Sequence, residues 1–247
     1  MKSKKIWQIK LGLVLIVLTA AIYYLHFIIF HDVHHIFIYL LGDIAFLPLE
    51  VLIVTLIIHR VLSHKEKQVK LEKLNMVIGA FFSELGFKLL SYISDSDPNL
   101  DRIKSYLVID GDWDNEKFIK VERILKSYNY EVDRTKIDWV LLRGLLKERR
   151  DFLLRLIENP VLLEHESFTE LLRSVFHITE ELENREDLSS LPESDLDHIA
   201  ADLKRVYTNI ISQWLKYMLH LKDNFPYLFS LAMRSNPFDD NSSFIVS

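Results

Sequence analysis

Two long apolar segments near the start of the sequence constrain the fold of this chain more than any other feature. Residues 11–30 contain no formally charged side chain, and residues 36–58 contain only two, both acidic. A helix of about twenty residues, rising about 1.5 Å per residue, crosses roughly 30 Å of hydrocarbon. We therefore expect two transmembrane helices joined as a tight hairpin.

A cleaved signal peptide is the competing interpretation of the first segment. Its apolar run is longer than is usual for such a peptide, and no small-residue cleavage site of the A-x-A type follows it. Instead, a second apolar segment begins after only five residues. We therefore expect the first segment to be retained as an anchor.

Basic residues flank the pair of apolar segments and predict its orientation. The turn at residues 31–35 has neither Lys nor Arg, whereas the outer flanks contain Lys2, Lys4, Lys5, Lys10, Arg60, Lys65, Lys67, Lys70 and Lys73. Cytoplasmic flanks of membrane helices are enriched in Lys and Arg. We expect a multi-pass protein of a lipid bilayer, with both termini in the cytoplasm, in a prokaryotic inner or plasma membrane.

Composition argues against several classes of function. Cysteine is absent, which excludes disulfides, Cys-ligated zinc and thiol nucleophiles, and only 6 glycines are available for phosphate-binding loops. From Leu74 onward there are 21 Lys and Arg against 30 Asp and Glu, so nucleic-acid binding is not expected. No known catalytic motif survives inspection. We expect neither an enzyme nor a bound cofactor.

The rest of the chain is patterned for helices, so the predicted fold class is all-α. Apolar residues at 71, 74, 78, 81 and 85 follow helical spacing and predict that the second membrane helix continues as a stalk. This stripe suits either another copy of the chain or later helices of the same chain. The predicted division is a hairpin (1–58), a membrane-proximal stalk (59–93), a cytoplasmic helical domain (94–235) and a tail (236–247) that is mobile unless residues 236–238 dock.

Helix starts in the cytoplasmic domain are predicted from capping residues. Asp114 is expected to cap a helix over residues 115–127, and Asp133 a helix over residues 134–158 that Pro160 ends. Another helix is expected at residues 167–183. The last long helix is expected to start near Pro192, behind a capping box.

The sharpest candidate site lies within the second apolar segment. Asp43 and Glu50 are seven residues apart, so in an unbroken helix they lie on one face, about 10 Å from each other. Pro48 lies between them and cannot donate to the carbonyl of Ile44, which predicts a free acceptor and a kink. Carboxylates are costly at mid-membrane and are seldom left there without water, a counter-charge or a bonding partner.

These acids support two functional hypotheses of different classes. In the first, several copies form a homo-oligomer in which Asp43 and Glu50 face a hydrated path for cations or protons. In the alternative, the acids merely hold helices together, and the chain is a membrane-tethered scaffold or sensor whose helical domain binds other proteins. The two hypotheses differ in where the Asp43 face points: toward a common axis of the oligomer in the first, and into a sealed helix contact in the alternative.

Weaker candidates remain outside the apolar segments. The turn offers imidazole and carboxylate ligands for zinc, copper or nickel at His31, Asp32, His34 and His35, with a solvated turn as the alternative. His177 with Glu180 and Glu181 is expected to form a surface ion pair. Asp195 and His198 have the spacing of part of a di-iron motif but lack its companion ligands.

Overall fold

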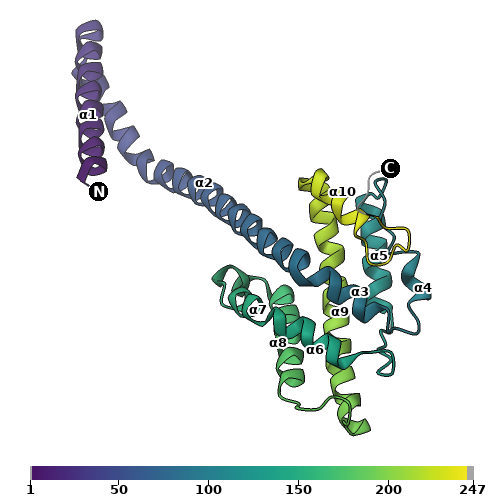
Figure 1. Ribbon diagram of the computed structural model, residues 1–247. Coiled ribbons are helices and arrows are strands. Elements are labelled where there is room, and N and C mark those ends of the chain that lie inside the picture. The colour runs from purple at the N-terminus through teal and green to yellow at the C-terminus, as the bar shows by residue number, and fades with distance from the viewer. Residues whose placement is uncertain (1, 244–247) are drawn as a thin grey trace. The chain divides into compact units, whose positions relative to one another are not determined.

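The computed structural model describes residues 2–243, and every element of regular structure in that range is helical (Figure 1). The prediction of an all-α protein is therefore confirmed. The α-helices are α1 (Lys2–Phe30), α2 (Val33–Phe81), α3 (Phe87–Ser94), α4 (Asp101–Lys104), α5 (Asn115–Ser127), α6 (Trp139–Glu148), α7 (Arg150–Ile157), α8 (Glu166–Glu183), α9 (Glu193–Asn224) and α10 (Pro226–Arg234). The chain divides into two compact units, one ending at Lys67 and the other beginning at Gln68.

In the first unit, α1 and the start of α2 form a helical hairpin around a two-residue turn. His31 adopts a left-handed conformation with φ of 51°, and its N–H donates to the Phe27 carbonyl at 2.9 Å, which ends α1. Asp32 Oδ1 then accepts the N–H of His35 at 3.1 Å and caps the start of α2. The reversal is thus produced by two residues.

The hairpin helices are apolar around most of their circumference. Their apolar windows have no buried residue, and by length and composition both helices could cross a membrane. The more shielded side chains are Tyr23 and His26 of α1 and Ile36 and Leu40 of α2. A lipid environment is compatible with this outward apolar surface.

The end of α2 belongs to the core of the second unit rather than to a separate stalk. Leu74, Ile78 and Phe81 are buried there, and Leu85 is buried in the π-helical turn Phe82–Gly86 that follows. The stripe predicted for residues 71–85 therefore packs against helices of the same chain over most of its length, with Leu71 remaining exposed. This differs from the predicted stalk of residues 59–93, because the apolar stripe finds its partners within the domain.

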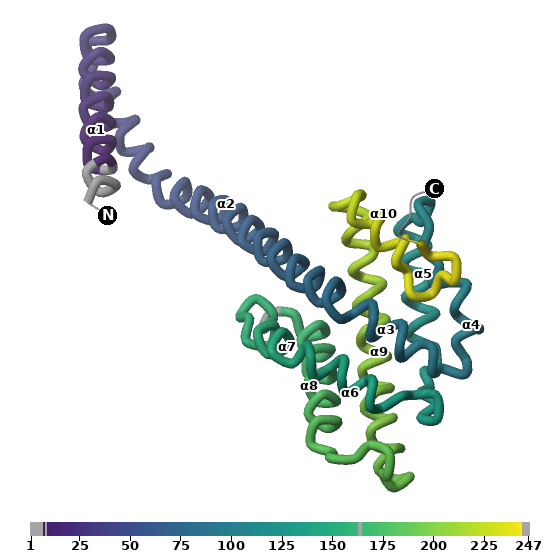
Figure 2. Tube along the Cα trace, viewed as in Figure 1, coloured from purple at the N-terminus to yellow at the C-terminus, as the bar shows by residue number. Residues whose placement is uncertain are grey.

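The second unit is a helical domain built around α9. This helix packs against α8, α10, α3 and α5, and Figures 1 and 2 show it running through the middle of the domain. Its buried residues recur at helical spacing, among them Leu203, Val206 and Ile210. The domain core is thus assembled around one long helix.

Capping decided where the helices begin, and the predictions were partly wrong. Asp114 caps α5 as predicted, through a 2.8 Å bond from the N–H of Lys117. Asp133 does not cap a helix, because its carboxylate accepts the N–H and hydroxyl of Thr135, and Asp138 caps α6 instead. In place of the single helix predicted over residues 134–158, the structure has two helices, α6 and α7, separated at Arg149.

The last helices agree with the prediction in part. The helix expected at residues 167–183 is confirmed as α8, and α9 begins directly after Pro192, as expected. No capping box precedes α9, because the Ser190 hydroxyl donates to Asp187 at 2.7 Å instead. The short helix α10, which begins with Pro226, was not predicted.

The start of the predicted tail docks on the domain. Asn236 Nδ2 donates to the buried Leu107 carbonyl at 2.8 Å, and the Phe238 ring packs against Trp214 with centroids 5.1 Å apart. Both Asn236 and Phe238 are about 1% exposed. Residues 236–238 are therefore part of the core, and residues 244–247 lie outside the described range.

Candidate functional site

The predicted acidic site lies on an unbroken stretch of α2. The helix continues through Pro48, and in an ideal helix a separation of seven residues corresponds to about 20° around the axis and about 10 Å along it. All residues from 41 to 50 are exposed. The two carboxylates therefore share one open face of an apolar helix.

The hairpin does not cover these acids. The shielded positions of α2 in the hairpin are Ile36 and Leu40, which precede Asp43, and no residue from 41 to 50 is shielded. Within residues 2–243, neither Asp43 nor Glu50 forms a hydrogen bond or an ion pair. Neither carboxyl group therefore has a counter-charge or a hydrogen-bond donor among the residues that the structure describes.

A polar residue of α1 was missed by the sequence analysis. His26 has its Nδ1 atom buried without a hydrogen-bond partner in the part of the chain that the structure describes. Its ring lies 4.7 Å from that of Phe30. A lone histidine inside an otherwise apolar segment was the signal that could have identified it.

Three of the four metal ligands predicted in the turn have other contacts in the structure. His31 and Asp32 form the turn itself, and the His35 ring packs edge-on against Tyr39 at 4.8 Å. Among the described residues, no group of three or more His, Asp or Glu side chains is arranged to hold a metal ion. The structure therefore does not bring the proposed ligands together.

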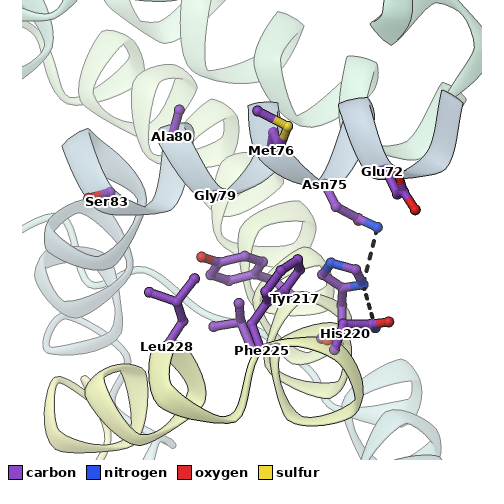
Figure 3. Close-up of a pocket in the computed structure, with 12 residues that line it drawn as sticks. Glu72, Asn75, Met76, Gly79, Ala80, Ser83, Tyr217, His220, Phe225 and Leu228 are labelled. Carbon is purple, nitrogen blue, oxygen red and sulfur yellow. Dashed lines mark hydrogen bonds between the residues drawn. The ribbon is translucent and has the colours of Figure 1, made fainter. Parts of the chain in front are cut away.

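A pocket of about 690 Å³ lies in the helical domain, between the end of α2 and the α9–α10 corner (Figure 3). No pattern in the sequence predicts this pocket, because it forms only where α2 docks on the domain and α10 follows α9. Its walls are mostly apolar, with a few polar groups. The lining residues are Glu72, Asn75, Met76, Gly79, Ala80, Ser83, Tyr217, His220, Leu221, Asn224, Phe225 and Leu228.

The polar groups of the pocket centre on His220. The side-chain amides of Asn75 and Asn224 both contact His220 Nδ1, each with an N···N distance of 3.1 Å. Burial lowers the pKa of the imidazole, an effect that the nearby Asp223 carboxylate opposes. The neutral form of His220 is therefore favoured near neutral pH.

Tyr217 forms the wall beside His220. Its ring stacks on Phe82 with centroids 5.1 Å apart and planes within 7°, and burial raises the pKa of its phenol. A Cβ atom at Gly79 would lie 3.2 Å from the Tyr217 hydroxyl. The glycine thus allows α2 to approach this ring closely.

A cluster of charged residues joins α8 to α9. The Nε2 atoms of His177 and His198 lie 3.3 and 3.5 Å from Oδ2 of the buried Asp202. His177 also lies 4.0 Å from the Glu181 carboxylate. The contact expected between His177 and Glu181 is therefore present and extends to a buried acid on the neighbouring helix, and it is an ion pair when the imidazole is protonated.

Comparison with known protein families covers most of the sequence. A family model described as "Uncharacterized protein MJ1433, C-terminal helical domain" matches residues 70–234. The chain belongs to the MJ1433 family. A second model, "MJ1433, N-terminal helical domain", matches residues 2–62.

A relative in the MJ1433 family is similar along its whole length. It is the "Uncharacterized protein MJ1433" of Methanocaldococcus jannaschii, which is 48% identical over 243 residues, or 98% of each chain. No solved structure matches the sequence. The acidic pair falls within the N-terminal MJ1433 model and the whole pocket within the C-terminal one.

Proposed function

We propose that this protein is an integral membrane homo-oligomer in which Asp43 and Glu50 line a hydrated path for cations or protons. One observation carries the proposal: the two acids share one exposed face of an apolar helix, and the hairpin leaves that face open. In a membrane, carboxylates on such a face need polar partners, which further copies of the chain or water would supply.

Carboxylates are costly to place in hydrocarbon. Each ionised carboxylate near mid-membrane costs roughly 2.5 to 3.5 kcal/mol on insertion scales. A single hairpin offers Asp43 and Glu50 no compensating partner, and two helices are too few to enclose a polar path. Assembly around a common axis would surround both acids with water and with the acids of neighbouring copies.

Pro48 adds an acceptor to the same region. It lacks an N–H, so the Ile44 carbonyl loses its usual helical donor. In a membrane, such a carbonyl is satisfied by a neighbouring helix, by water or by an ion. A carbonyl between two carboxylates favours cations over anions.

The proposal requires that both helices span the bilayer with the turn outside. The absence of cysteine makes this directly testable, since any single introduced cysteine is the only thiol in the chain. With a membrane-impermeant maleimide, Val33→Cys should be labelled in intact spheroplasts, and Ser127→Cys only after permeabilisation. Labelling of Ser127→Cys in intact spheroplasts would contradict the proposed topology.

Conduction is tested by cation flux into liposomes that contain the purified oligomer. The double variant Asp43→Asn, Glu50→Gln should lower the flux at least tenfold, because both negative charges of the path are removed. Glu66→Gln is the matched control, since Glu66 is an exposed acid on α2 outside the apolar segment. Unchanged flux in a double variant that still assembles, or no wild-type flux, would refute the cation path.

A second candidate function is supported by the pocket of the helical domain. In this proposal the chain is a membrane-tethered sensor or scaffold, and the helical domain is its binding module. The supporting observation is a half-open, largely apolar pocket with a defined polar end, which is typical of ligand sites. This function would be favoured if the double variant Asp43→Asn, Glu50→Gln showed the same cation flux as the wild type and a ligand bound to the helical domain.

A further inference from the structure

We propose that the pocket between α2 and the α9–α10 corner binds a long-chain, uncharged amphiphile through a head-group oxygen that accepts a hydrogen bond from His220 Nε2. This inference gives the second proposed function, the sensor, a ligand class, and it does not depend on the cation path. It is based on the hydrogen-bonding state of His220, the composition of the walls and the charges around the polar end.

First, the tautomer of His220 follows from the orientation of two amides. The structure turns the amide nitrogens of Asn75 and Asn224 toward Nδ1, and because an amide nitrogen can only donate, this orientation makes Nδ1 an acceptor that the two donors share. In a neutral imidazole the proton then resides on Nε2. Figure 3 shows both amide contacts meeting at one ring nitrogen, with the other nitrogen turned away from Asn75. Among the described residues, no acceptor is hydrogen-bonded to Nε2, so this donor is available to a ligand.

The second step concerns the apolar walls. Tyr217, Leu221, Phe225 and Leu228 supply the α9–α10 side of the pocket, and Figure 3 shows Tyr217 and Leu228 directed toward α2. Phe225 remains 38% exposed. The volume of about 690 Å³ lies within the range that binds molecules of moderate size. An alkyl or isoprenoid chain would cover this apolar surface.

The third step selects the head group. Glu72 lines the polar end of the pocket, and no Lys or Arg is among the described lining residues. A carboxylate or phosphate head would meet this negative charge without a counter-charge. An ammonium head offers no acceptor for the Nε2 proton of His220. A hydroxyl, ether or carbonyl head group carries no negative charge and has an oxygen that can accept the Nε2 proton.

The polar end also distinguishes an amphiphile from a protein helix. Asn75, His220 and Glu72 gather at one end of the pocket, whereas Leu228 lies at the other end, where Ser83 adds a single hydroxyl (Figure 3). A helix laid into a groove presents an apolar stripe along its whole length. A single polar head on an apolar chain matches this division better.

The test is photoaffinity labelling of the full chain in phosphatidylcholine nanodiscs, using a hexadecanol analogue with a mid-chain diazirine. Label should appear within residues 72–83 and 217–228, and hexadecanol should displace it at lower concentration than hexadecanoate does. His220→Phe keeps an aromatic ring but removes the donor, so it should weaken half-maximal labelling about three- to tenfold.

Two tryptophan variants give a matched comparison. Leu228→Trp should fill the pocket and abolish labelling there, whereas Leu231→Trp, at an exposed position of α10 outside the pocket, should not alter it. Melting by circular dichroism identifies any variant that fails to fold. If Leu228→Trp does not fold, His220→Phe and the competition between alcohol and acid still decide the outcome.

Several results would overturn the proposal. These are labelling confined to residues 11–58, equal competition by hexadecanoate and hexadecanol, or labelling unaffected by His220→Phe. A disulfide between two copies of Leu228→Cys, formed in the otherwise cysteine-free chain, would identify the pocket as an interface between copies instead. Asp43→Asn should leave labelling unchanged, so failure of the ligand site and failure of the cation path are separable.

Discussion

Arg185 and Asp195 form a bidentate ion pair, in which Nε and Nη2 of the guanidinium each lie 2.7 Å from a carboxylate oxygen. The same guanidinium donates from Nη1 to the Glu181 carboxylate at 2.7 Å. Arg185 thereby links the end of α8 to the start of α9. These two helices enclose much of the domain core, so the link bears on the stability of the domain.

Replacing Arg185 by Met should lower the unfolding midpoint of the helical domain by about 2–5 °C, because a bidentate, charge-assisted contact is lost. Three of the four tryptophans, Trp113, Trp139 and Trp214, lie in this domain, so tryptophan fluorescence reports its unfolding. Arg173→Met is the matched control, since Arg173 is exposed and forms no ion pair in the described residues. An equal shift in both variants would contradict the role assigned to Arg185.

The stabilisation by Arg185 should disappear in acid. Its hydrogen bonds hold the pKa values of Glu181 and Asp195 below their ordinary values of 4.5 and 3.8. Carboxylates with lowered pKa values stabilise the fold above those ordinary values and lose this effect as the pH falls through the lower folded-state values. The difference in midpoint between wild type and Arg185→Met should be fully present above pH 4.5 and should shrink as the pH falls below the ordinary values of 4.5 and 3.8. A difference that persists unchanged in strong acid would show that packing, not charge, is responsible.

Two glycines should respond oppositely to alanine. A Cβ atom at Gly86 would lie 2.6 Å from Phe82 Cδ1 and 2.9 Å from Phe81 Cε1, both in fully buried rings. Gly86→Ala should therefore destabilise the domain by about 1–3 kcal/mol through overpacking. Gly144 lies in α6 with open space around it, so Gly144→Ala should be neutral or stabilising by up to about 1 kcal/mol. Urea unfolding followed by fluorescence measures both, and a stable Gly86→Ala variant would show that the rings can move.

A buried carboxylate depends on a tyrosine hydroxyl. Tyr128 Oη donates to Asp97 Oδ2 at 2.8 Å, and Asp97 is only 5% exposed. Tyr128→Phe should cost about 1–2 kcal/mol, because the carboxylate loses a donor where water is largely excluded. Tyr227→Phe is the control, since Tyr227 is 71% exposed and has no hydrogen bond among the described residues. Equal unfolding free energies for the two variants would refute the importance of this bond.

Local signals explain which parts of the fold were predictable. Asp114 caps α5 as predicted, because a cap needs only an acceptor and an N–H three residues later. Asp133 has the same chemistry but failed as a predictor, since its carboxylate bonds within the turn to Thr135 while Asp138 begins the helix. Sequence alone offers no means to rank two such residues, because both can form their local bonds.

The candidate sites also divide into features set by local sequence and features set by tertiary packing. The sequence by itself determined the two apolar segments, the helical class and the shared face of Asp43 and Glu50, since charge and helical spacing are local properties. Only the tertiary structure decided that the hairpin leaves those acids open and that a pocket forms around His220. The physical reason is distance along the chain: Asn75 and His220 are 145 residues apart, and only the packing of α2 against α9 brings them into contact.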